Sequence, residues 1–234
     1  MKKDDTLAYI ADLTSALELI DNKTPLLEHL DKELLQQKKK LKRLKHKLKG
    51  LHFVGVWTVF TLFGLMPMSL LNSIIETDFN FLVITPLVSL IVLFLYKTKY
   101  SKGQQKTQIK AIENSVNRLS GDNRNLIGEI NYSANLADEA LTLLMLDDTK
   151  TDYHISDCDL SLTNTVSLKY IYMFINKGAP TLNFKAGIQH FSEIIDNAKQ
   201  KQEYKDLLNT YQEGMLQAEY RRGVIKRCAK ESAD

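Results

Sequence analysis

The sequence has few of the residues that build disulfide-rich folds or interrupt helices. Its 234 residues include two cysteines, four prolines and ten glycines. Two cysteines far apart do not suggest a disulfide framework. The scarcity of proline and glycine leaves room for long helices. No alternating run bounded by turn pairs indicates a strand, so the sequence predicts an all-α protein.

Catalytic and ligand-binding motifs are also missing. The chain contains no G-x-S-x-G turn and no glycine-rich phosphate loop. We therefore expect no enzyme activity, no cofactor and no metal site. His154 and Cys158 are four residues apart and could both bind zinc on one helix face, but a structural zinc site needs four ligands. An acidic, solvated linker over residues 148–162 is the simpler interpretation.

Charge is strongly segregated, although the formal net charge is only +3. Nine basic residues and one acidic residue lie between Lys32 and Lys49, and five lysines and no acid lie between Lys97 and Lys110. A uniformly solvated surface would not sort its charges in this way. The two basic runs flank the least polar part of the chain.

That apolar part consists of two uncharged segments, residues 51–71 and 79–96, joined by residues 72–78. A membrane-spanning helix needs roughly 17 to 25 such residues, and basic residues gather on the cytoplasmic side of membrane helices. We therefore expect an integral membrane protein with a two-helix transmembrane hairpin. Its localisation would be the inner membrane, multi-pass, with both termini in the cytoplasm.

Other interpretations of these runs fit less well. A cleaved signal peptide would not begin at residue 51, and a helix buried in a protein core would usually keep a polar stripe. The lysines could contact nucleic acid, but a membrane explains their position, and we do not expect nucleic acid as a partner. The basic residues expected at lipid headgroups are Lys45, Lys47, Lys49, Lys97 and Lys99.

Heptad repeats lie on both outer sides of the apolar segments. Apolar residues recur at alternating spacings of three and four over residues 25–50 and again over 98–147, which is typical of a coiled coil. The pairing could form an antiparallel stalk within one chain or join subunits of a homo-oligomer. The interface residues expected are Leu27, Leu30, Leu34, Leu41, Leu44, Leu48, Ile109, Ile112, Val116, Leu119, Asn123 and Leu126.

The position of Asn123 allows two interpretations. Asn123 could be a buried asparagine that fixes the register of the coiled coil, or residues 120–123 could break the helix. Upstream, residues 1–24 are expected to form a separate amphipathic helix, with a turn over residues 22–25 and Pro25 in the first turn of the next helix.

Residues 163–234 are expected to form a small C-terminal helical module. Apolar residues at helical spacing predict helices over about 163–176, 182–198 and 201–230, with Gly178 capping the first. The last helix is expected to end in an exposed basic segment containing Arg221 and Arg227.

Part of this module, residues 170–193, is similar to a pattern of bacterial membrane and coiled-coil proteins. In that pattern one helix ends at Asn-Lys-Gly and a second helix begins near Thr-Leu. The resemblance implies a bacterial origin and brings no activity with it. The matching residues are Asn176, Gly178, Thr181, Leu182, Gly187, Ile188 and Phe191.

Together these features predict a membrane-anchored coiled-coil interaction or scaffold protein. The expected partners are membrane lipid and either further copies of the chain or a cytoplasmic protein docked on the C-terminal module. The alternative is an oligomeric pore-forming or membrane-perturbing effector of toxin-like or defence type.

Overall fold

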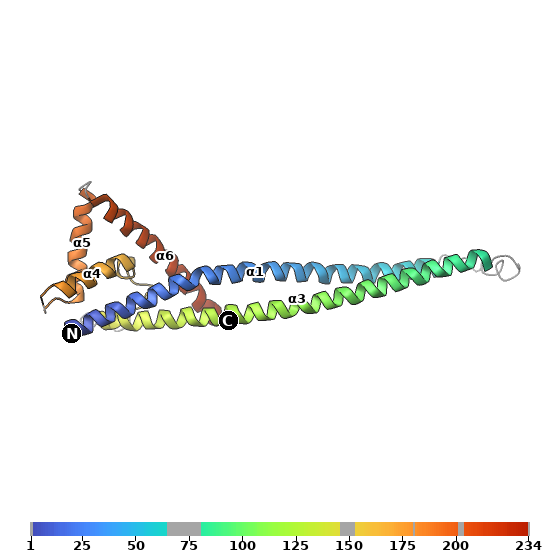
Figure 1. The fold of residues 1–234 in the computed structure, drawn as a ribbon, viewed down its shortest axis with the longest axis horizontal. Coiled ribbons are helices and arrows are strands. Elements are labelled where there is room, and N and C mark those ends of the chain that lie inside the picture. The colour runs from blue at the N-terminus through green and yellow to red at the C-terminus, as the bar shows by residue number, and fades with distance from the viewer. Residues whose placement is uncertain (1, 65–80, 146–152, 180, 201–203, 234) are drawn as a thin grey trace. The chain divides into compact units, whose positions relative to one another are not determined.

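The computed structural model describes residues 2–64, 81–145, 153–179, 181–200 and 204–233, with the backbone alone for residues 49–64, 81–98 and 100. The protein is all-α (Figure 1). The elements formed by the described residues are α1 (Lys3–Gly64), α3 (Phe81–Leu144), the 3-10 helix η1 (Leu160–Leu162), α4 (Thr165–Lys177), α5 (Phe184–Gln200) and α6 (Lys205–Ala233).

The predicted transmembrane hairpin is wrong. No helix within the described residues is both long enough and apolar enough to cross a membrane. In the first apolar segment the described helix runs from Leu51 to Gly64, which is 14 residues. In the second it runs from Phe81 to Tyr96, which is 16 residues.

The predicted multi-pass localisation in the inner membrane, with both termini in the cytoplasm, is corrected for the same reason, since it depended on that hairpin. The predicted connecting loop over residues 72–78 lies outside the described residues.

The contacts of the chain define two units. Unit 1 comprises Met1–Asp31 and Asp122–Asp234, and unit 2 comprises Lys32–Gly121. In unit 2, α1 and α3 of the same chain face each other, and Lys45 Nζ lies 2.7 Å from Glu113 Oε1. The heptad side chains here are less exposed than most of their neighbours: Ile109 and Leu119 are buried, and Leu34, Leu41, Leu44, Leu48, Ile112 and Val116 are half-buried.

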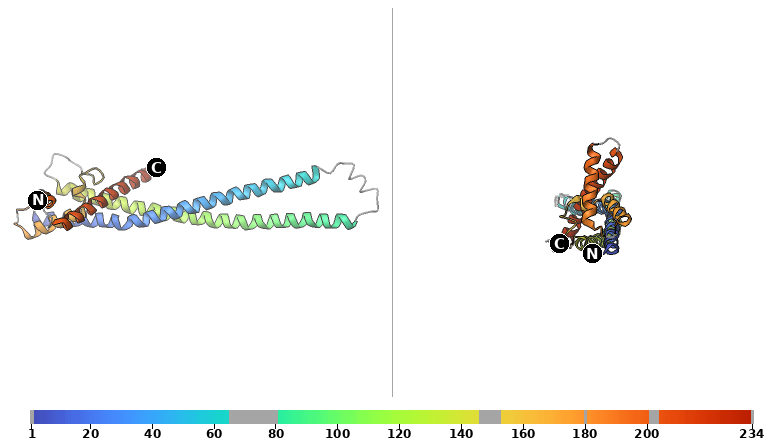
Figure 2. Two further views of the ribbon diagram at one scale, coloured as in Figure 1. Left: turned by 90° about the horizontal axis from the view of Figure 1, so that it is seen from above. Right: turned by 90° about the vertical axis from the view of Figure 1, so that its left-hand side faces the viewer.

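Unit 1 holds the main hydrophobic core. The N-terminal part of α1 and the C-terminal part of α3 pack against each other and against the C-terminal helices (Figures 1 and 2). The amphipathic stripe at the start of α1 supplies one wall of the core. Its members Ile10, Leu13, Leu17 and Ile20 are all completely buried.

The break expected at residues 22–25 is absent, because α1 continues through Pro25. Proline has no N–H to donate to the carbonyl of Asp21. The neighbouring residues nevertheless hold the helix in place: Ile20 and Leu27 are buried in the core, and the Thr24 hydroxyl donates to the Ile20 carbonyl at 2.8 Å. Tertiary packing here outweighs the local cost of proline.

The C-terminal helices are close to the sequence prediction. Gly178 caps α4 as expected, and its N–H donates to the carbonyls of Phe174 and Ile175. Helix α5 begins at Phe184, two residues later than predicted, because the Asn183 side chain accepts a hydrogen bond from the Ala186 N–H and caps the helix there.

The second half of the predicted solvated linker is packed instead. Ile155 is only 2% exposed, and its N–H donates to Asp138 Oδ1 on α3 at 2.7 Å. The ring of His154 lies 2.9 Å from the other oxygen of the same carboxylate. The acids at residues 147, 148 and 152 lie outside the described residues.

Candidate interaction surface

A groove of about 1020 Å³ lies on unit 1 between α1 and α3. No residue of α4, α5 or α6 contributes to its lining. The α1 side is formed by Tyr9, Asp12, Ser15, Ala16, Leu19 and Lys23, and the α3 side by Arg124, Asn125, Gly128, Glu129, Tyr132, Ser133, Leu136, Glu139, Ala140 and Leu143. We call this surface the paired-helix groove.

The groove follows from a second stripe on each helix. On α1 its residues 9, 12, 16, 19 and 23 recur at alternating spacings of three and four, and residues 125, 129, 132, 136, 139 and 143 do so on α3. Such spacing keeps side chains on one helix face. The adjacent stripe on α1, with Ile10 and Leu17, is buried in the core. The two helices therefore present a continuous second face.

Large apolar side chains of this face remain in contact with solvent. Leu19 is 41% exposed, Leu136 is 42% exposed and Tyr132 is 66% exposed. Small residues lie between them, including Ala16 and Gly128, and small residues let another backbone approach closely. An exposed apolar surface with a polar border is a frequent mark of an interaction site.

The groove is bordered by charges of opposite sign at its two ends. Helices α1 and α3 are antiparallel here, since Lys23 pairs with Glu129 and the Asn123 amide donates to Asp31 at 2.7 Å. Asp12 and Glu139 therefore lie toward one end, and Lys23 and Arg124 toward the other.

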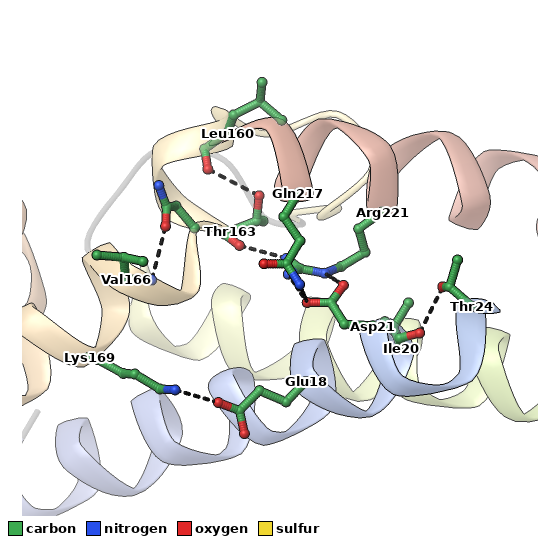
Figure 3. A network of polar contacts seen from close by, with 11 residues as sticks. Glu18, Ile20, Asp21, Thr24, Leu160, Thr163, Val166, Lys169, Gln217 and Arg221 are labelled. Atoms are coloured by element: carbon green, nitrogen blue, oxygen red, sulfur yellow. Dashed lines mark hydrogen bonds and ion pairs between the residues drawn. The ribbon is translucent and has the colours of Figure 1, made fainter. Parts of the chain in front are cut away.

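A buried ion pair joins α6 to α1 within unit 1 (Figure 3). Arg221 is only 2% exposed. Its Nε donates to Asp21 Oδ1 at 2.7 Å, its second terminal nitrogen donates to Asp21 Oδ2, and its Nη1 donates to the Thr163 carbonyl at 2.7 Å. Gln217 adds a third donor to Asp21 at 2.9 Å. The two-pronged geometry fixes the position of α6 on α1.

Further polar contacts attach the C-terminal helices to α1. Lys169 of α4 lies 2.7 Å from Glu18 (Figure 3). Arg227 of α6 donates to Asp31, and Tyr220 donates to Glu28. That last bond raises the pKa of Tyr220, because ionisation would remove the donated proton. These contacts lie on one side of α1. They leave the second stripe of α1, which lines the paired-helix groove and is called the groove stripe, uncovered by α4, α5 and α6.

A close backbone contact sets the path of α6 past the start of α4. Asn164 caps α4 by accepting from the Val166 N–H at 2.9 Å, and its amide donates to the Tyr211 carbonyl at 3.0 Å. A Cβ on Gly214 would lie 2.9 Å from Asn164 Cγ, which is closer than such atoms approach. Glycine at residue 214 is therefore a packing requirement.

The two thiols lie in settings that disfavour the reactive thiolate. Both are free, and Cys228 is completely buried. Burial raises the pKa of Cys158 to about 11 and that of Cys228 to about 11. A thiol in such a setting is a poor nucleophile at neutral pH. Within the described residues no group of three or more His, Cys, Asp and Glu side chains could hold a metal ion.

The predicted stalk residues belong to both units. Leu27 and Leu126 are buried in unit 1 and Leu30 is half-buried there, whereas Leu34, Leu41, Leu44, Leu48, Ile109, Ile112, Val116 and Leu119 belong to unit 2. Asn123 is 7% exposed inside an unbroken α3, so the helix break considered at residues 120–123 does not occur. Their use between subunits stays a prediction.

The lysines predicted at lipid headgroups differ in their contacts and exposure. Lys45 forms the ion pair with Glu113, while Lys47 and Lys99 are exposed. The side chains of Lys49 and Lys97 lie outside the described residues. Lys47 also lines a second groove of about 740 Å³ on unit 2, together with Lys40 and Arg43.

Sequence reasoning missed the paired-helix groove and the Arg221 ion pair. The residues of the groove stripe recur at alternating spacings of three and four, as the leucine heptads do. Because several of them are polar or charged, their pattern in the sequence is weaker than that of the heptads. The ion pair joins residues 200 positions apart and leaves no local signal.

Comparison with protein-family models, with characterised proteins and with solved structures gave no match.

Proposed function

We propose that this protein is a helical interaction or scaffold protein that binds a protein partner through the paired-helix groove of unit 1. The observation that carries the proposal is the exposed apolar face formed by Leu19, Tyr132 and Leu136. Burying such side chains stabilises a complex, since each Å² of apolar surface removed from water contributes about 25 cal/mol.

The packing of the other helices favours the paired-helix groove, rather than the C-terminal module, as the docking site. The apolar faces of α4 and α5 are already used inside the unit, where Ile171, Ile175, Phe184 and Phe191 are buried. The groove stripe on α1 and α3 has no such internal partner among the described helices.

The titratable groups of unit 1 also fit a structural role better than a catalytic one. Asp21 and Arg221 form a buried ion pair, and Asp138 accepts a hydrogen bond from the Ile155 N–H and contacts the His154 ring. The alternative of a pore-forming effector was motivated by the hairpin corrected above, and no observation among the described residues favours it.

Site-specific photo-crosslinking tests the proposal. A photoreactive amino acid replaces Leu136 in the groove, and in a separate variant it replaces Leu216 on α6, which is 67% exposed and lies outside the groove. We expect Leu136 to give a discrete adduct in cells, identifiable by mass spectrometry, and Leu216 to give none. Equal and diffuse labelling at both positions would contradict the proposal.

A further inference from the structure

The charges around the paired-helix groove are arranged so that the groove complements itself. Asp12 and Glu139 border one end, and Lys23 and Arg124 border the other. Asp12, Glu139 and Arg124 form no ion pair with any described residue, whereas Lys23 pairs with Glu129 inside the groove. Three charged groups are thus available at the edge of an apolar surface.

We propose that the groove binds the groove of a second copy of this chain, with the two copies related by a two-fold axis. This deepens the proposed function by naming the partner, and it rests on that function. A two-fold axis that crosses the two helices places each end of the surface against the opposite end of its partner. Arg124 of each copy then faces Glu139 of the other.

The spacing along α3 agrees with this symmetry. The midpoint between Arg124 and Glu139 falls next to Tyr132. This midpoint lies in the apolar centre of the groove. The axis therefore passes through the exposed apolar side chains, which is where a dimer needs its buried core.

The second stripe also has the form that a four-helix arrangement requires. Residues 9, 12, 16, 19 and 23 of α1 and 125, 129, 132, 136, 139 and 143 of α3 keep the alternating spacing of three and four. Such stripes interdigitate when helix pairs pack side by side. The small residues Ala16, Gly128 and Ala140 allow the pairs to approach closely.

A partner protein with a single amphipathic helix could also occupy an apolar groove. The charge pattern favours a second copy, because the opposite charges of Arg124 and Glu139 complement themselves across a two-fold axis. A single partner helix places no such requirement on Glu139 and Arg124 together.

The test is the mass of the purified full chain, measured by sedimentation over a range of concentrations. A mild detergent is included so that the uncharged segments at residues 51–71 and 79–96 do not associate non-specifically. We expect the wild type to form a dimer, Leu136→Asp to be monomeric, and Leu216→Asp on α6 to behave as the wild type. Unchanged helicity by circular dichroism shows that Leu136→Asp folds.

Charge exchange makes the test specific to self-association. Arg124→Glu alone and Glu139→Arg alone are each expected to weaken the dimer about tenfold, because each change acts twice across the axis. The double variant Arg124→Glu/Glu139→Arg is expected to regain dimerisation, since the opposite charges again face each other. A hetero-partner would not restore this pattern.

Three results would each overturn the proposal. The wild type could be a monomer, Leu136→Asp could dimerise as strongly as the wild type, or the double variant Arg124→Glu/Glu139→Arg could fail to regain dimerisation. The consequences differ for the proposed function. If the Leu136 adduct contains another protein, the interaction role stands and only self-association falls. If Leu136 gives no adduct, the interaction role falls as well.

Discussion

Arg221 on α6 and Asp21 on α1 form a two-pronged ion pair in which the guanidinium is 2% exposed. The Thr163 carbonyl accepts a further hydrogen bond from the same guanidinium, so three segments of the chain meet at one side chain. This contact holds the C-terminal helices on the side of α1 away from the groove stripe.

Removing one partner of this pair should destabilise the protein strongly. Asp21→Ala leaves a buried guanidinium without its carboxylate, and we expect a loss of about 3–5 kcal/mol in the free energy of unfolding. The double variant Asp21→Ala/Arg221→Met should lose less, because no buried charge remains unpaired. Chemical denaturation followed by circular dichroism measures both. A double variant less stable than Asp21→Ala would contradict the assignment.

Gly214 and Gly223 of α6 should respond in opposite ways to alanine. A Cβ on Gly214 meets the Asn164 side chain, whereas one on Gly223 meets nothing within 4 Å. We expect Gly214→Ala to cost about 1–3 kcal/mol and Gly223→Ala to be neutral or to stabilise by up to about 1 kcal/mol, since alanine favours the helix. Thermal unfolding of the two variants decides this. Equal effects would mean that α6 does not approach Asn164 as described.

The two cysteines should react slowly in the folded protein. With a thiol pKa of about 11 for Cys158 and for Cys228, only about one thiol in 1000 is ionised at pH 8. We expect both to be modified by a maleimide far more slowly than in denaturant, and the rate to rise with pH up to about 11. Rapid modification of Cys228 at neutral pH would show that its site is open.

The same pKa shifts predict a loss of stability in alkaline solution. A thiol whose pKa is raised by folding contributes its full stabilisation to the free energy of unfolding below its unfolded pKa, near 9. This stabilisation is lost as the pH approaches 11. The free energy of unfolding should therefore fall across that range. Because Tyr211 also has a raised pKa through burial, the comparison is made against Cys158→Ala/Cys228→Ala, in which the fall should be smaller.

The pairing of the two heptad segments in unit 2 should occur within one chain. Lys45→Cys and Glu113→Cys replace an ion pair of 2.7 Å and are expected to be joined by a short bismaleimide into a product of monomer mass. The experiment uses a Cys158→Ser/Cys228→Ala background. Products mainly of dimer mass would place the heptads between subunits.

Periodicity predicted the buried faces of the helices well, because it is a local property. Leu34, Leu41 and Ile112 lie on the less exposed side of their helices. Local signals failed where distant residues decided the outcome. Pro25 suggested a turn, yet packing keeps it inside α1, and Arg221 was expected in an exposed basic end although it is buried against Asp21.

The apolar segments near the middle of the chain show the limit of reading hydropathy alone. Their lengths in sequence suggested membrane spans, but no helix of the described residues combines the length and the apolar character that a span needs. The groove was missed for a related reason. Asp12 and Glu139 dilute its apolar pattern, and only the antiparallel pairing of α1 with α3 brings the two stripes together.

The accessibility of Leu136 in cells tests the central claim most directly. In the Cys158→Ser/Cys228→Ala background, Leu136→Cys and Leu216→Cys are labelled with a maleimide in the producing cells and again in dilute purified protein. An interaction surface predicts that Leu136→Cys is labelled at least about tenfold more slowly in cells, while Leu216→Cys is labelled equally in both. Equal rates for Leu136→Cys in cells and in dilute solution would contradict the assignment of the groove as a binding surface.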